Sequence, residues 1–289
     1  MSKIWTTRAA RLNHGAHKMK QKDRLEFSRR IFGNAGVAVC VLLTTTVLLM
    51  SSAHAEKGED AVETLKAMSD YIAGQKTLSV TFDSDVEVIT SDLQKLQFTS
   101  SGQVQLSRPD KLRATRTGGY TDVEIVFDGK TLTVNGKDKN IFAQLDSPGS
   151  VDQLIGLLRD KYAVAAPGGD LLLSRSFDEM MMDVIDAKDV GRGVIDGVEC
   201  EHLAFRNVDT DWQIWIELGA RPVPHKYVIT SKAVTGMPQY TLRIKEWRTD
   251  VPADAFAFKS PQGAQKVALE ALADTDEVPQ GTATTGEKK

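Results

Sequence analysis

The sequence predicts a mainly β protein of the α+β class: a strongly curved antiparallel half-barrel of about ten or eleven strands, with helices plugging its concave face. Its composition, 41% apolar and 26% charged over 289 residues, is typical of a globular chain. Between residues 78 and 247, apolar and polar residues alternate in successive runs, which indicates strands with one buried face. Short turns join these runs and favour antiparallel neighbours. A closed barrel or a two-sheet sandwich would also satisfy the pattern.

Residues 1–55 have the pattern of a cleavable export signal. A basic stretch reaches Arg30, an apolar run covers residues 35–50, and Ala53-His54-Ala55 supplies the small residues of a cleavage site. At about 16 residues, the apolar run is shorter than the roughly 20 residues of a membrane-spanning helix. Ser28-Arg29-Arg30-Ile31-Phe32 resembles the twin-arginine export motif, although an ordinary secretion (Sec) signal can also contain paired arginines. We therefore expect a periplasmic protein, exported by either route.

Charge is divided unevenly between the export segment and the rest of the chain. Residues 1–55 carry nine Lys/Arg against two acidic residues, which leaves 27 basic and 37 acidic residues in the remainder. Such an acidic chain lacks the clustered positive charge that binding to phosphates requires, so we expect no nucleic-acid partner. Only Cys200 remains after the export segment, and a lone cysteine cannot form an internal disulfide.

The first element expected after the signal is an amphipathic helix over residues 60–75. Its apolar residues recur at three- and four-residue spacing, and Gly74 marks its end. The period then changes to two, which predicts long, half-buried strands over residues 78–88 and 96–106. The apolar positions that define these elements are Ala61, Val62, Leu65, Met68 and Ile72, then Leu78, Val80, Phe82, Val86 and Val88, then Leu96, Phe98, Val104 and Leu106.

Turn dipeptides then organise a meander of shorter strands. After a turn at residues 108–110, a third strand is expected over residues 112–117. Asp128-Gly129 and Asn135-Gly136 are favoured in two-residue hairpin turns, and they predict where the next strands end. Those strands are expected over residues 123–127, 132–134 and 141–145.

The second half of the chain is expected to begin with another helix, after which strands resume. A second helix is expected to open at Ser150, and the apolar runs at 171–173 and 180–182 favour short helices and loops. Strands are then expected over residues 184–190, 198–205, 212–218, 226–231 and 239–247. From residue 273 the chain is polar, which predicts a disordered tail. The expected organisation is an export signal over 1–55, one domain over 56–272 and a tail over 273–289.

Four segments of the chain resemble a bacterial family of predicted periplasmic proteins of unknown function. They are Gly197–Arg206, Asp211–Glu217, Pro224–Thr230, and Phe256–Phe258 with Pro261–Ala264. The resemblance extends over about residues 60–272. The family looks like part of the superfamily of the lipoprotein carrier LolA, its receptor LolB and the stress regulator RseB. Those proteins share a half-open antiparallel barrel whose helices close an apolar cavity for acyl chains, and the resemblance implies that fold here. The carrier's ligand-gating arginine has no counterpart by motif, so no binding residue is carried over.

The sequence carries no strong catalytic or metal-binding motif. Catalytic zinc usually needs three protein ligands, whereas only His202 and His225 follow the export segment. His202 and Cys200 share one strand face, but no Cys-x-x-Cys accompanies them. A Gly-x-Ser-x-Gly elbow, a phosphate loop and a dinucleotide fingerprint are all missing from the sequence. We therefore expect no enzyme, no metal and no cofactor.

The candidate binding residues are apolar and aromatic side chains on the expected strands. Trp212 shares its face with Ile214 and Ile216, and such side chains could line a ligand cavity or simply fill the core. The function favoured is a carrier or chaperone that holds a lipid, an acyl chain or a lipoprotein in an apolar cavity. The alternative is an envelope module that interacts with or senses another protein, without a small-molecule ligand. We expect a monomer, with candidate cavity residues Phe82, Phe98, Trp212, Ile214, Ile216 and Tyr240.

Overall fold

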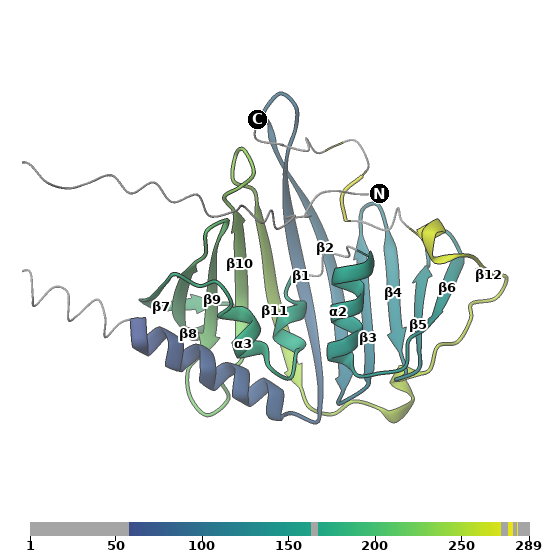
Figure 1. The fold of residues 1–289 in the computed structure, drawn as a ribbon, viewed down its shortest axis with the longest axis horizontal. Coiled ribbons are helices and arrows are strands. Elements are labelled where there is room, and N and C mark those ends of the chain that lie inside the picture. The colour runs from purple at the N-terminus through teal and green to yellow at the C-terminus, as the bar shows by residue number, and fades with distance from the viewer. Residues whose placement is uncertain (1–57, 163–166, 273–276, 280–281, 283–289) are drawn as a thin grey trace, which may run out of the picture.

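The computed structural model describes residues 58–162, 167–272, 277–279 and 282, and one large sheet dominates it (Figure 1). Twelve strands are hydrogen-bonded in the order β12-β6-β5-β4-β3-β2-β1-β11-β10-β9-β8-β7, so β12 and β7 form open edges. The strand pairs are antiparallel except for β12 with β6. The strands are β1 (Thr77–Ile89), β2 (Lys95–Ser107), β3 (Lys111–Gly118), β4 (Asp122–Phe127), β5 (Thr131–Gly136), β6 (Ile141–Asp146), β7 (Asp186–Ile195), β8 (Val198–Arg206), β9 (Thr210–Glu217), β10 (Pro224–Ser231), β11 (Gln239–Arg248) and β12 (Gln265–Lys266).

This architecture confirms the prediction of a mainly β protein with one curved, unclosed, mostly antiparallel sheet. Eleven of the strands lie where the alternation of residues places them. The additional strand, β12, has only two residues and is too short to leave a periodic pattern. Strand β7 runs to Ile195, beyond the predicted end at residue 190, because a bulge at Gly191 (φ 106°) breaks the alternation there without ending the strand.

The helices lie on one face of the sheet, which we call the helix-covered face; the opposite face is the open face (Figure 1). A first helix covers residues 58–74, close to the predicted range, and runs in front of β7 to β11. Helix α2 (Val151–Tyr162) lies in front of β2 and β3, and α3 (Ser176–Met180) lies in front of β10. A 3-10 turn, η1 (Gly169–Leu172), precedes α3 in the run expected to form short helices and loops.

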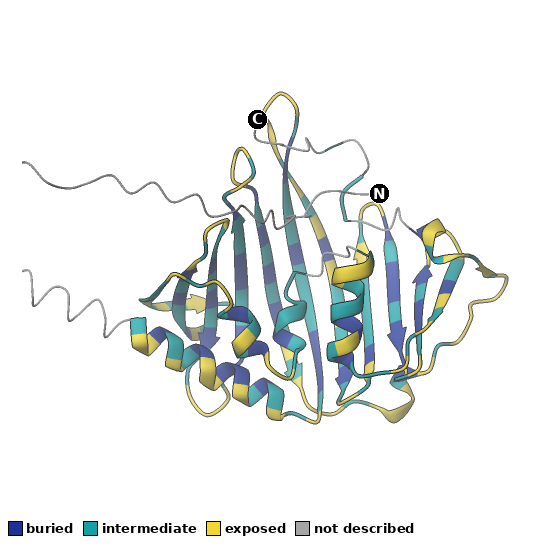
Figure 2. Cartoon of the chain, in the orientation of Figure 1, coloured by how far each residue is buried: buried dark blue, intermediate teal, exposed yellow. Residues whose placement is uncertain are grey.

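The principal core lies between these helices and the sheet (Figure 2). Each helical element contributes buried apolar residues to one continuous cluster, and the sheet contributes the inward positions of its strands. From the helical elements come Ala61, Leu65, Met68, Ile72, Val151, Leu154, Ile155, Leu171 and Met180. From the sheet come Leu78, Val80, Leu106, Leu112, Phe127, Leu132, Leu203, Phe205, Trp212, Ile214, Ile216, Tyr227, Tyr240, Leu242 and Ile244.

Two predicted hairpin turns have different outcomes. At Asp128-Gly129 the turn forms, because the Asp128 carboxylate accepts hydrogen bonds from the backbone amides of Lys130 (2.9 Å) and Thr131 (2.8 Å). The prediction of a turn at Asn135-Gly136 is wrong: both residues belong to β5, and Gly136 pairs with Ile141. Asn135 is buried and donates a hydrogen bond of 3.1 Å to Glu124, which keeps it in the strand.

The segment after β11 passes from the open face round the β12 edge. Its 3-10 turn η2 (Ala253–Phe256) lies on the open face, where Arg113 donates a hydrogen bond of 2.9 Å to the Ala255 carbonyl. A further turn, η3 (Leu269–Leu272), buries Leu272 against Gly136, whose position in β5 faces the helices. Within the predicted tail, Glu277 returns to the sheet and contacts β1 and β3.

Candidate functional site

The six predicted cavity residues share the helix-covered face but form two separate groups. Val86 on β1 pairs with Phe98 on β2 and with Tyr240 on β11, and Phe82 lies four residues earlier on the same face of β1. Trp212, Ile214 and Ile216 lie on β9, which β10 and β11 separate from β1. The structure therefore brings Phe82, Phe98 and Tyr240 together on β1 and its two neighbouring strands. The other three predicted residues lie on β9, beneath α3 and the first helix.

The β9 group is packed into the core. Trp212 stacks on Phe205 with a ring-centroid distance of 4.0 Å and meets the edge of Tyr227 at 5.8 Å. Ile214 is fully buried, and Ile216 is almost so. A ligand could reach these side chains only by displacing the helices that cover them.

The β1 group surrounds a polar cluster on the same face, which we call the Ser84 cluster: Ser84, Arg116, Tyr240 and Glu277. The Ser84 hydroxyl donates a hydrogen bond of 3.0 Å to a carboxylate oxygen of Glu277, and Nη1 of Arg116 lies 3.7 Å from the same oxygen. Tyr240 lies on the neighbouring strand β11, where it pairs with Val86, two residues after Ser84 on β1. Burial, together with the negative charge of Glu277, raises the pKa of Tyr240, so its hydroxyl stays neutral.

A second polar contact joins the helical layer to the sheet. The Tyr227 hydroxyl on β10 donates a hydrogen bond of 3.2 Å to the Asp170 carboxylate on η1. Burial raises the pKa of Asp170, and burial beside that carboxylate raises the pKa of Tyr227 well above its ordinary value. This pair thus places an acidic group inside an apolar layer, where its charged form is unfavourable.

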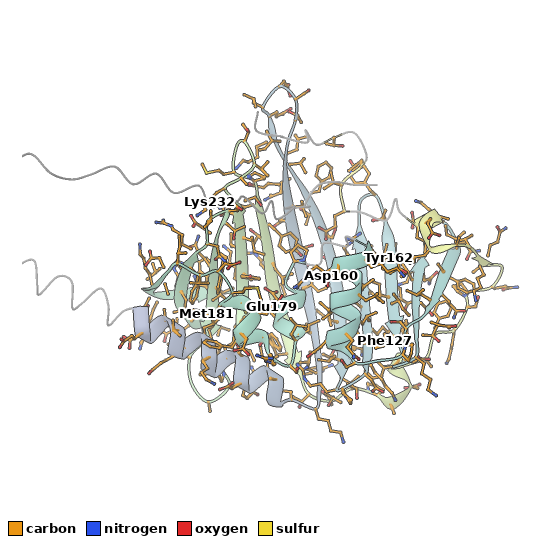
Figure 3. The ribbon with its side chains drawn as sticks, viewed as in Figure 1. Phe127, Asp160, Tyr162, Glu179, Met181 and Lys232 are labelled. Atoms are coloured by element: carbon orange, nitrogen blue, oxygen red, sulfur yellow. The ribbon has the colours of Figure 1, made fainter. Side chains whose placement is uncertain are left out.

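The helical elements are also tied to one another. Arg159 on α2 forms an ion pair with Glu179 on α3. Figure 3 labels Glu179, together with Asp160, the residue after Arg159. The backbone amide of Ser174, which precedes α3, donates a hydrogen bond of 3.2 Å to Asp152 on α2. Side-chain contacts therefore link α2 to α3 and to Ser174 before it.

A groove lies on the open face, opposite the predicted cavity residues. It has a volume of about 660 Å³ between β4 to β6 and the segment around Phe256 and Phe258. Its walls include the charged side chains of Asp128, Asp146 and Lys266, so it is more polar than an acyl chain requires.

The two histidines that follow the export segment, His202 and His225, lie on strands and have protein partners. His202 stacks on Trp215 at 4.0 Å between ring centroids and contacts Gln213 through Nε2 at 2.9 Å. His225 contacts Glu217 through Nε2 at 3.0 Å. Burial raises the pKa of the Cys200 thiol to about 11, so this thiol is poorly nucleophilic. In the described part of the chain, no group of three or more His, Cys, Asp or Glu residues is arranged to hold a metal.

Sequence reasoning missed most of the Ser84 cluster, although the signal was present for two members. Ser84 interrupts the inward apolar positions of β1, and Arg116 does the same after Leu112 and Ala114 on β3. A polar residue at an inward strand position indicates a buried polar contact, because an unpaired one would be unfavourable. Glu277 left no such signal, since it lies 193 residues from Ser84 along the chain.

The fold and this site define a mainly β protein with one helix-covered apolar face and a charged pair set into it. The chain belongs to the family described as predicted periplasmic protein (DUF2092), whose sequence model matches residues 61–270. This match confirms the family resemblance drawn from the sequence. No curated protein matches the chain in sequence. Across the described residues, we find no helix long and apolar enough to cross a membrane.

Several solved structures are similar to this chain at low sequence identity. An uncharacterized conserved protein from Thermus thermophilus is 13% identical with a TM-score of 0.42, over 72% of this chain and 99% of that chain. Lipoprotein LppX from Mycobacterium tuberculosis is 15% identical with a TM-score of 0.43, over 68% and 99% respectively. A LolA superfamily protein from Nitrosomonas europaea is 14% identical with a TM-score of 0.31, over 68% and 97%.

Proposed function

We propose that this protein is a non-enzymatic periplasmic carrier or chaperone that binds a lipid, an acyl chain or a lipoprotein between its sheet and its helices. One observation carries the proposal: a continuous apolar sheet face is covered by short helical elements that meet it through side-chain packing. Phe82, Phe98 and Tyr240 would form the ligand-contacting part of that face, and Trp212, Ile214 and Ile216 its deeper part. Residues 1–55, which lie outside the described residues, would serve as the cleaved export signal, of the Sec or twin-arginine type.

Ligand entry would require the helical layer to move away from the sheet. The contacts of α2 with α3, through Arg159–Glu179 and Asp152–Ser174, would let this layer move as one lid. Half-buried apolar residues along the face, among them Phe82, Val86 and Ile229, would then exchange contacts with the helices for contacts with an acyl chain. Such an exchange has a small net cost, because apolar surface stays out of water in both states.

Native mass spectrometry of the protein purified gently from the periplasm, followed by lipid extraction, tests the proposal. We expect an acyl-containing molecule to co-purify with the protein. Phe98→Ala should reduce the amount retained, because Phe98 is half-buried on the helix-covered face. Phe142→Ala is the matched control, since Phe142 packs against Phe258 on the open face. Equal retention by both variants, or an empty wild-type protein that also binds no added acyl probe, would contradict the proposal.

A second candidate function, interaction with another envelope protein, rests on the edge strand β7. Val190 and Val194 on this strand are exposed, and Ile185 just before it is also exposed. An edge with unpaired backbone groups and exposed apolar side chains can add a strand from a partner. When the wild-type protein is used to capture partners from envelope extract, a partner should be recovered, and the V190K/V194K variant should lose it. The lipid proposed for the carrier function should be retained by both proteins, because these substitutions lie on the edge strand and not on the helix-covered face.

A further inference from the structure

We propose that Ser84, Arg116 and Tyr240 bind the carboxylate of a long-chain amphiphile, and that Glu277 occupies this site as an internal competitor. This inference rests on the proposed function and names the ligand class: a single acyl chain with a carboxylate head group. The four residues come from three strands and from the chain's own C-terminal segment. Together they place an anion beside a cation on the mainly apolar helix-covered face.

The sheet supplies a site of the right shape and charge for one carboxylate. Ser84 is fully buried, and Tyr240 on the neighbouring strand is 7% exposed. Arg116 is oriented by a hydrogen bond of 3.4 Å from its Nη2 to the Thr121 hydroxyl. One cation and two neutral hydroxyl groups match a carboxylate, which accepts hydrogen bonds and carries one negative charge.

The present occupant of the site is itself a carboxylate. Glu277 places one oxygen 3.0 Å from the Ser84 hydroxyl and 3.7 Å from Arg116, and its side chain is only 13% exposed. The next two residues, Val278 and Pro279, are half-buried as well. Glu277 lies 193 residues from Ser84 along the chain and belongs to no strand of the sheet. Another carboxylate could therefore replace the Glu277 side chain in this site while the sheet stays folded.

Apolar side chains surround the cluster and specify what is attached to the carboxylate. Phe82 and Val86 lie on either side of Ser84 along β1, and Phe98 lies opposite Val86 on β2. A head group bound at Ser84 would therefore begin its acyl chain among aromatic and aliphatic groups.

The test compares a fatty acid with the fatty alcohol of equal chain length, binding to the full exported chain. Palmitate and hexadecanol are titrated, below their aggregation limits, against a fluorescent acyl probe. Glu277→Gln removes the competing charge and should tighten palmitate binding about tenfold, while hexadecanol binding changes little. Glu270→Gln is the matched control, because Glu270 is exposed on η3. Arg116→Gln should weaken palmitate binding about tenfold and spare hexadecanol.

The outcomes separate this inference from the function on which it rests. The inference would be overturned if all variants bound hexadecanol and Glu277→Gln left palmitate binding unchanged. The proposed function as an acyl carrier would stand in that case. Failure of both amphiphiles to bind any variant would overturn the carrier function, and the inference with it. Glu277→Gln alone decides the matter if Arg116→Gln folds poorly, because Glu277 lies outside the sheet. Thermal unfolding of each variant supplies the check on folding.

Discussion

Gly102 allows close packing of side chains and backbone beside the Ser84 cluster. It lies on β2 between Phe82 on β1 and Arg116 on β3, and the Phe82 ring extends over it. A Cβ at this position would lie closer than 3.0 Å to both the Thr115 carbonyl oxygen and the Phe82 ring. Since the carbonyl belongs to a paired strand, it cannot move aside easily.

We therefore expect Gly102→Ala to lower the free energy of unfolding by about 1–3 kcal/mol or more, as overpacking in a core does. Gly119→Ala is the control, because a Cβ there meets no atom within 4 Å. Urea unfolding followed by circular dichroism measures both variants. Equal stability of the two would show that the strands can separate locally at Gly102.

Asp170 predicts a pH dependence of stability. Burial raises its pKa in the folded state, whereas the unfolded chain titrates near the ordinary value of 3.8. Between these two pKa values the folded state holds a proton that the unfolded state has lost, so stability falls as pH rises through this window. Above the folded pKa, the protein carries the full cost of a buried charge, which the Tyr227 hydrogen bond and the charge of Arg159 partly offset.

Asp170→Asn removes this charge and keeps an oxygen that can accept from Tyr227. We expect the variant to melt at a higher temperature than the wild type at pH 7, with the difference shrinking as pH falls toward 4. Calorimetric melting at several pH values provides the measurement, and Asp254→Asn on the exposed η2 turn is the control. A difference that is constant with pH would mean that Asp170 does not titrate differently in the folded state.

At the scale of elements, α2 begins with a reciprocal capping box. The Ser150 hydroxyl accepts a hydrogen bond of 3.2 Å from the Gln153 amide, and Gln153 Oε1 accepts one of 2.8 Å from the Ser150 amide. We expect Ser150→Ala to cost about 1 kcal/mol of unfolding free energy, as the loss of an N-cap does. Ser91→Ala, at an exposed position in the β1–β2 turn, should change it little. Chemical denaturation of the two variants checks this.

The sequence predicts most elements because eleven of the strands contain apolar residues in alternation with polar ones, a local pattern that can be recognised without knowing the neighbouring strands. The helix at residues 58–74 and α2 were predictable for the same reason, from local period and capping residues. The turn at Asn135 failed because a contact with Glu124, across the strand pair, outweighs local turn preference. Glu277 was beyond prediction, since its partners depend on how the whole sheet is wrapped by the C-terminal segment.

At the scale of the molecule, the sheet separates two buried regions with different roles. The helix-covered face holds the continuous apolar cluster, while the open face buries a smaller set of residues under the segment after β11. Val80 and Val126 are matched probes of the two regions, because both are buried valines on strands, at 6% and 2% exposure. Val80 faces the helices, and Val126 lies beside Phe256 on the open face.

Val80→Ala and Val126→Ala should each lower the free energy of unfolding by about 1–3 kcal/mol, from lost burial and the cavity that remains. Only Val80→Ala should tighten hexadecanol binding, because it makes room beside Phe82 where the acyl chain would lie. Parallel urea unfolding and probe displacement measure both quantities for each variant. If Val126→Ala tightened binding equally, general loosening of the fold would explain ligand entry, and the helix-covered face would have no special role in it.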